Sequence, residues 1–178
     1  MQREQRALGL LNLGGGIAVL ASYAWSFSYS SELRAGLWGG VPEAVRPIYT
    51  VNMLLAAVGY FPLTWLYLFR TTPGELESAT GVRYGLLFLL YGLVLIPSAL
   101  WLPMTARMLL TPGLLLWWGI RCVLALVGIG SLGLLWLSFR HAQTRPGLAS
   151  WAATAGAIPF FTQTAILDAL LWPAFYPA

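Results

Sequence analysis

The feature that most constrains the fold is a succession of five apolar stretches, each near twenty residues or longer. They cover residues 8–27, 49–69, 84–102, 113–139 and 148–172. An α-helix needs about 20 apolar residues to cross the ~30 Å hydrocarbon core of a bilayer. Outer-membrane strands are about 10 residues long and alternate apolar with polar side chains, which these stretches do not. The pattern predicts an all-α integral membrane protein with a bundle of five transmembrane helices.

Composition supports this class and excludes a soluble domain. The chain of 178 residues is 58% hydrophobic and only 9% charged, whereas soluble domains carry about 25% charged residues. No segment between the apolar stretches is long enough for a soluble domain. Residues 1–178 are therefore predicted to form a single transmembrane domain in contact with the lipid bilayer.

The N-terminus leaves the number of helices open between five and four. A basic "MQREQR" precedes the first apolar stretch, and "ASYA" at residues 21–24 has the small residues of a signal-peptide cleavage site. Cleavage would leave four helices. The apolar stretch is long for a signal peptide, which favours a retained first helix.

The distribution of arginine predicts the orientation. All ten basic residues are arginines. If the N-terminus is cytoplasmic, six lie on that side and three in the opposite loops: Arg3, Arg6, Arg70, Arg83, Arg140 and Arg145 against Arg34, Arg46 and Arg107. Cytoplasmic loops carry the excess of basic residues, so the N-terminus is predicted inside and the C-terminus outside. The arginines form no stripe, and a nucleic-acid partner is not expected.

Small residues predict where the helices pack. Because lipid provides no hydrophobic gain for helix association, small side chains must let the backbones approach. The second stretch has Asn52, Ala56 and Gly59 on one face, and the fifth has an alanine-rich face that includes Gly156. These faces are predicted to pack within the bundle, with a homodimer seam as the alternative.

One glycine motif invites a different interpretation. "GIGSLG" at residues 128–133 matches a dinucleotide-binding fingerprint, but that motif requires a preceding strand and a downstream acidic residue. Here it lies inside an apolar stretch. It is predicted to form a packing groove.

Three polar residues inside the apolar stretches are the most informative for function: Asn52, Arg121 and Asp168. A charge at the bilayer centre costs roughly 2.5–3.5 kcal/mol on the most permissive scale. At 1.5 Å per residue, Arg121 lies ~12 Å and Asp168 ~8 Å from the outer helix ends. An Arg121–Asp168 ion pair is therefore predicted. The alternative is that Arg121 snorkels to the outer headgroups.

Aromatic residues at the same depth predict a small-molecule site, because such sites combine an apolar lining with a few polar groups. The alternative is that the tryptophans only form interfacial belts. The candidate ligand-binding residues are Asn52, Trp101, Trp117, Trp118, Arg121, Phe161, Thr164 and Asp168.

Catalytic and metal-binding patterns are not found in the sequence. His141 is the only histidine and is predicted to lie at a solvated helix end. No histidine, cysteine and glutamate cluster suits a metal, and no second carboxylate accompanies Asp168 for acid–base chemistry. No catalytic residue, metal ligand or cofactor is identified.

The layout resembles the TspO/translocator-protein (tryptophan-rich sensory protein) family. Shared features are five helices with short loops, many tryptophans and a longer first external loop over residues 28–48. "SALWLPM" resembles the family's third helix, and Trp151 with Asp168 stands where its fifth helix has a Trp followed by an Asn. The family's paired prolines before helix two are absent. The resemblance implies a pocket for a tetrapyrrole or sterol-like ligand, and no functional residue is carried over.

Together these observations predict a non-enzymatic protein that binds a hydrophobic or amphipathic small molecule in the outer-leaflet half of the bundle. A structural or accessory subunit of a larger membrane complex is one alternative. A membrane-embedded enzyme acting on a lipid-like substrate, with Asp168 as its acid–base group, is another.

Overall fold

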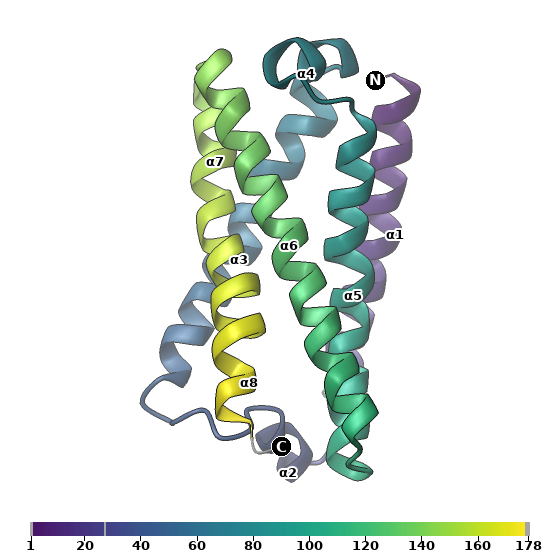
Figure 1. Ribbon diagram of the computed structural model, residues 1–178, viewed down its shortest axis with the longest axis vertical. Helices are drawn as coiled ribbons and strands as arrows, with labels where there is room; N and C mark the ends of the chain where they lie inside the picture. The colour runs from purple at the N-terminus through teal and green to yellow at the C-terminus, as the bar shows by residue number, and fades with distance from the viewer. Residues whose placement is uncertain (1, 27, 177–178) are drawn as a thin grey trace.

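The protein is a bundle of long helices with short connections (Figure 1). The computed structural model describes residues 2–26 and 28–176, and no strand occurs within that part of the chain. Five helical segments are long and apolar enough to cross a membrane, as the sequence predicted. They are α1 (Arg3–Ser26), α3 (Arg46–Trp65) continued by the π-helix η1 (Leu66–Arg70), α5 (Gly85–Leu110), α6 (Leu114–Thr144), and α7 (Leu148–Phe161) continued by the π-helix η2 (Thr162–Leu171) and α8 (Trp172–Phe175).

Two helices extend well beyond their predicted ends. The third predicted stretch, which ends at residue 102, continues through Pro103 to Leu110. Proline is tolerated inside transmembrane helices because neighbouring groups satisfy the freed backbone atoms. The fourth stretch continues to Thr144. The predicted end of the first stretch, at residue 27, lies outside the described residues.

Two short helices cover the opposite ends of the bundle. The helix α2 (Ser31–Gly36) lies at the lower end in Figure 1, with the C-terminus, and α4 (Pro73–Thr80) lies at the upper end, with the N-terminus. The hydroxyl of Ser30 accepts the backbone N–H of Leu33 and caps α2. A reciprocal pair of hydrogen bonds between Thr72 and Glu75 caps α4. These helices close the ends that the long helices leave open.

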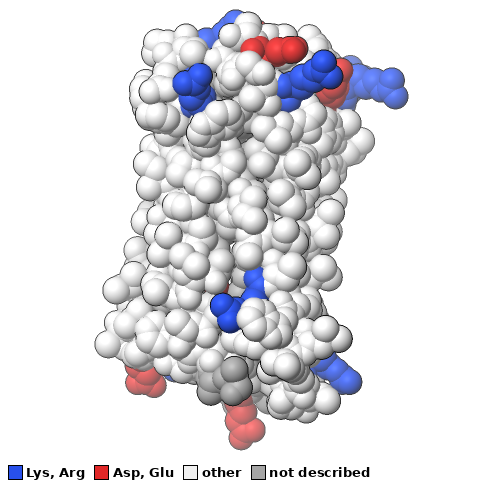
Figure 2. All heavy atoms as spheres, in the orientation of Figure 1, with Lys and Arg blue, Asp and Glu red and all other residues white. Residues whose placement is uncertain are grey.

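The surface has the distribution expected of a bilayer-spanning protein. In Figure 2 the charged side chains gather at the two ends, and the band between them is mostly uncharged. Exposed side chains on this band are large and apolar, including Leu13, Val58 and Leu132. Apolar side chains on this scale remain exposed because hydrocarbon, rather than water, surrounds them.

The closest helix contact joins α3 to α7. A Cβ placed on Gly59 would lie 2.3 Å from the carbonyl oxygen of Gly156. A Cβ placed on Gly156 would lie 2.4 Å from the carbonyl oxygen of Gly59. Ala56 on α3 and Ala153 and Ala157 on α7 are buried beside this contact. The predicted small-residue faces therefore meet each other within one chain.

The "GIGSLG" motif lies inside α6, and its glycines face neighbouring helices. Gly128 faces Ala165 of η2, while Gly130 and Gly133 face Leu90 of α5. The predicted packing groove is confirmed.

Substituting the glycine at the α3–α7 contact should destabilise the bundle. In Gly59→Ala the new methyl group overlaps a backbone oxygen, so we expect a loss of about 1–3 kcal/mol, typical of overpacking. The matched control is Gly14→Ala in α1, where a Cβ meets nothing within 4 Å. Thermal unfolding in detergent compares the two, and a Gly59→Ala protein as stable as the control would refute the contact.

Candidate functional site

The lower half of the bundle holds two adjoining cavities of about 300 and 370 Å³. Four helical segments contribute side chains to both cavities: Tyr23 from α1, Met53 from α3, Trp101 from α5, and Gln163 and Asp168 from η2. Because they share these walls, we treat them as one site and name it the lateral cavity.

The lateral cavity lies between α1 and α3 and faces the lipid. The two helices approach each other at the upper end, where Gln5 of α1 donates to the carbonyl of Leu68 in η1 at 3.0 Å. Further down they lie on different sides of the bundle (Figure 1). The cavity wall there includes Leu20 of α1 and Leu54 of α3, which are 70% and 61% exposed. An apolar molecule could therefore enter from the bilayer.

A chain of polar side chains leads from α3 to Asp168. The amide of Asn52 donates to the carbonyl of Pro159 and to Oε1 of Gln163, each at 3.1 Å. The amide of Gln163 then donates to Oδ1 of Asp168 at 2.8 Å. Both amides are thereby fixed in orientation, and they hold the carboxyl of Asp168 at the cavity wall.

The π-helical segment η2 makes the contact between Gln163 and Asp168 possible. In an α-helix, residues five apart are separated by ~140° around the axis. A π-helix bonds residue i to residue i+5, which brings these positions close to one face. This spacing extends over the ten residues of η2.

Aromatic rings surround the end of the cavity where the Asp168 carboxyl lies. Trp101 packs edge-on against Tyr23 and against Trp172, with ring centroids 6.4 and 6.1 Å apart. Tyr49 adds another ring to the same wall, and its hydroxyl donates to the carbonyl of Leu167 at 3.0 Å. The indole of Trp172 donates to the Leu37 carbonyl at 3.0 Å and so holds the residue after α2 over the lower end.

Four of the predicted site residues belong to this arrangement. Trp101, Thr164 and Asp168 line the cavity. Asn52 reaches it through Gln163. The hydroxyl of Thr164 also donates to Ser131 of α6 at 2.6 Å, which anchors η2 to its neighbour.

Three predicted aromatic residues lie elsewhere. Trp117 is buried and stacks on Tyr176, with ring centroids 5.4 Å apart. Trp118 is 56% exposed on the outer surface of α6. Phe161 is not part of the cavity wall, and its neighbour Phe160 is. Regular α-helical spacing would put Phe161 on one face with Asp168 and Trp172, but the π-helix η2 between them breaks that spacing.

The predicted Arg121–Asp168 ion pair is not formed. Among the described residues, no arginine nitrogen lies within 4.0 Å of the Asp168 carboxyl. The Arg121 guanidinium instead lies over Trp118, 4.9 Å from its ring centroid. The preceding Ile120 is fully buried, so Arg121 points ~100° away from the interior face of α6. Counting residues predicted similar depths for the two side chains, but Asp168 faces the cavity and Arg121 faces outward.

Of the five residues that line both parts of the cavity, three were missed. Gln163 carried a usable signal, because it is a polar residue inside an apolar stretch with polar neighbours on both sides. Tyr23 and Met53 had no such signal in the sequence, since their position at the cavity depends on how α1 and α3 diverge.

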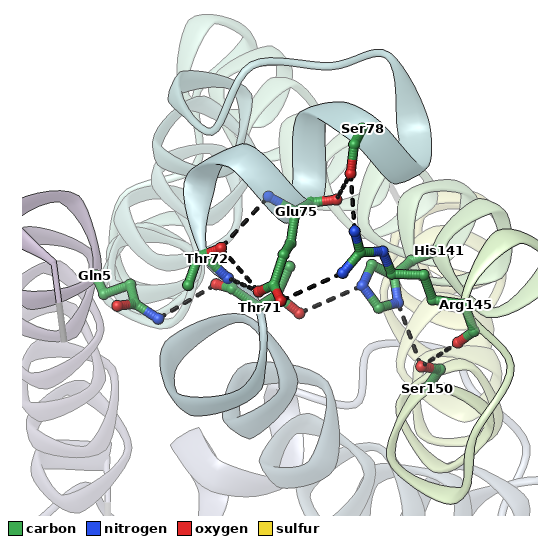
Figure 3. Close-up of polar contacts among 8 residues, drawn as sticks. All are labelled: Gln5, Thr71, Thr72, Glu75, Ser78, His141, Arg145 and Ser150. Atoms are coloured by element: carbon green, nitrogen blue, oxygen red, sulfur yellow. Dashed lines mark hydrogen bonds and ion pairs between the residues drawn. The ribbon is translucent and has the colours of Figure 1, made fainter.

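A second polar cluster lies at the opposite end of the bundle (Figure 3). His141 is 4% exposed, not solvated as predicted. Its Nε2 lies 3.4 Å from the hydroxyl of Thr71, and its Nδ1 lies 3.3 Å from the hydroxyl of Ser150. Because the loop before α4 and the first turn of α7 fold over the end of α6, the ring is enclosed. His141 thus joins three segments.

Charged groups extend this cluster to the surface. The guanidinium of Arg145 lies 3.3 Å from Oε1 of Glu75 and donates to the hydroxyl of Ser78 at 3.0 Å. The backbone N–H of Thr72 donates to Oε2 of Glu75 at 2.8 Å. This N–H, the Thr72 hydroxyl and the Arg145 charge together lower the pKa of Glu75.

The stabilising effect of Glu75 should depend on pH. Because its pKa is lowered on folding, the ionised carboxylate stabilises the protein above the ordinary glutamate pKa of ~4.3, and the effect is lost as the pH falls through the lowered value. We therefore expect Glu75→Gln to unfold at a lower temperature than the wild type at pH 7. The two proteins should converge towards pH 3, and a difference that persists there would contradict the assignment.

Arg121 and Asp168 should act independently on stability. Thermal unfolding of Arg121→Leu, Asp168→Leu and the double variant measures the interaction free energy between the two side chains. We expect the two changes to add within about 0.5 kcal/mol, as separated sites do. A double variant that recovers much of the lost stability would show that the pair forms.

Comparison of the chain with protein-family models, with curated proteins and with solved structures finds no match.

Proposed function

We propose that this polytopic membrane protein binds a hydrophobic or amphipathic small molecule in the lateral cavity. The observation that carries the proposal is the carboxyl of Asp168, fixed by Gln163 in the wall of an otherwise largely apolar and aromatic cavity. An apolar lining with a few oriented polar groups is the usual character of small-molecule sites.

The size of the cavity supports this proposal. Ligand pockets commonly measure ~300–1,000 Å³, and each part of the lateral cavity measures about 300 to 370 Å³. The polar chain from Asn52 to Asp168 is formed without a ligand. Binding would therefore require little ordering of these groups, which lowers its entropic cost.

We further propose that the cavity faces the outer leaflet. Most arginines lie at the end that carries the N-terminus and α4, and the excess of basic residues marks the cytoplasmic side. The TspO-like layout remains a hypothesis, and with it a tetrapyrrole or sterol-like ligand.

The two other functional classes make different predictions for Asp168→Asn. A structural subunit has no use for the carboxyl beyond its bond to Gln163, and an amide accepts the same bond. An enzyme that uses Asp168 for proton transfer would lose turnover. A binding protein would keep its fold and change its affinity.

Filling the cavity tests the proposal directly. Ser98 of α5 lines the cavity, and Ser98→Phe should occupy it. The matched control is Leu100→Phe, two residues away on the same helix at a position that is 47% exposed. Native mass spectrometry of proteins purified in mild detergent should show a retained small molecule in the wild type and the control, but not in Ser98→Phe.

Two results of that experiment would contradict the proposal. One is retention of the same molecule by Ser98→Phe at the level of Leu100→Phe. The other is the absence of any retained small molecule in all three proteins. Thermal unfolding of the variants separates loss of binding from loss of fold.

A further inference from the structure

We infer that the lateral cavity selects amphiphiles whose head group is positively charged, with the cation placed against Asp168 and the hydrocarbon between α1 and α3. This inference rests on the proposed binding function and adds the chemical class of the ligand.

The carboxyl of Asp168 has no cationic partner within the described part of the chain. There, its one hydrogen bond is the one that Oδ1 accepts from Gln163. No arginine among the described residues forms an ion pair with it. Asp168 is partly buried. A carboxylate removed in part from water without a cationic partner is costly, and some of that cost is recovered when a cation pairs with it. A ligand that brings a positive charge gains this energy, whereas a neutral ligand does not.

Aromatic rings lie beside the carboxyl of Asp168. Tyr23, Tyr49, Trp101 and Trp172 all line the cavity that Asp168 lines. Aromatic faces attract cations, and aromatic cages are a recurrent means of binding alkylated ammonium groups. A carboxyl surrounded by aromatic rings therefore suits an ammonium group better than a metal ion or an anion.

The other charged residue of the cavity wall does not oppose this arrangement. Arg34, on α2, lies at the lower, loop-covered end and is exposed. Its guanidinium donates to the carbonyl of Tyr29 at 2.9 Å. Its charge therefore lies nearer to water than the carboxyl does.

The part of the cavity that opens to lipid is apolar and is lined by Val19, Leu20, Leu54 and Ala57. These side chains offer no hydrogen-bonding groups. An alkyl chain could lie along them with its far end in the bilayer. The ligand class that fits both ends is a single-chain alkylammonium or a related amine.

Matched probes test the inference. The cation is dodecyltrimethylammonium, and its neutral isostere has a carbon atom in place of the nitrogen. Binding of each to the full-length protein in lipid nanodiscs, below micellar concentration, is measured by native mass spectrometry. We expect the wild type to bind the cation at least about tenfold more tightly than the isostere, equivalent to ~1.4 kcal/mol.

Two variants test whether Asp168 causes the preference for the cation over the isostere. In Asp168→Asn the ratio of the two affinities should fall to about twofold or less, because the amide keeps the size of the side chain and loses its charge. The control is Glu43→Gln, which removes a carboxylate from the same end of the molecule; the Glu43 side chain is 90% exposed. That variant should keep the preference. If Asp168→Asn does not fold, Trp101→Leu replaces it, and the expected loss is about threefold.

The outcomes separate this inference from the proposed function. If the neutral isostere binds as tightly as the cation and Ser98→Phe blocks both, the cavity binds ligands but the charge selectivity is wrong. If Asp168→Asn keeps the full preference, the inference is also overturned. If neither probe binds, or Ser98→Phe blocks neither, the proposed function itself fails.

Discussion

The rest of the structure depends on how closely α3 and α7 approach each other at Gly59 and Gly156. Between helices in lipid, burial provides no hydrophobic gain, and close backbone packing must supply the association. The two helices run in opposite directions. Seven residues, or about two turns, below the glycines lie Asn52 on α3 and Gln163 in η2. Because the glycines set the distance between the backbones, these two amides meet.

The contact between α3 and α7 also explains why a cavity lies beside it. Further down, the hydroxyl of Tyr49 bonds to the carbonyl of Leu167, so α3 follows α7 and η2 to the lower end. The helix α1 follows α5 instead, with Gly15 packed on Leu95. Because α3 is held by α7 and η2 while α1 is held by α5, the two helices separate. The space between them is the lateral cavity. The π-helical turn of η2 then presents Asp168 to that space.

Much of the architecture could be predicted from the sequence because it depends on length, composition and the position of small residues. Five apolar stretches give five helices, and the small-residue faces of α3 and α7 meet at Gly59 and Gly156. The depth of Asp168 and of Asn52 also follows from counting residues along a helix.

The direction in which a side chain points could not be predicted in the same way. Arg121 faces outward, since Ile120 faces the interior. The π-helical spacing of η2 moves Phe161 off the cavity face, and nothing in the composition of that segment indicates it. His141 is buried because a loop and a neighbouring helix fold over it, which is a tertiary effect. Such features depend on the packing of several helices at once.

The most direct test of this account is a crystal structure of the protein grown from a lipid phase without removal of bound molecules. The account predicts that α1 and α3 stay apart at the level of Leu20 and Leu54, with elongated non-protein density that contacts Asp168 and Trp101. A structure in which α1 closes on α3, so that Tyr23 and Met53 fill the space and Asp168 is sealed from the bilayer, would contradict it.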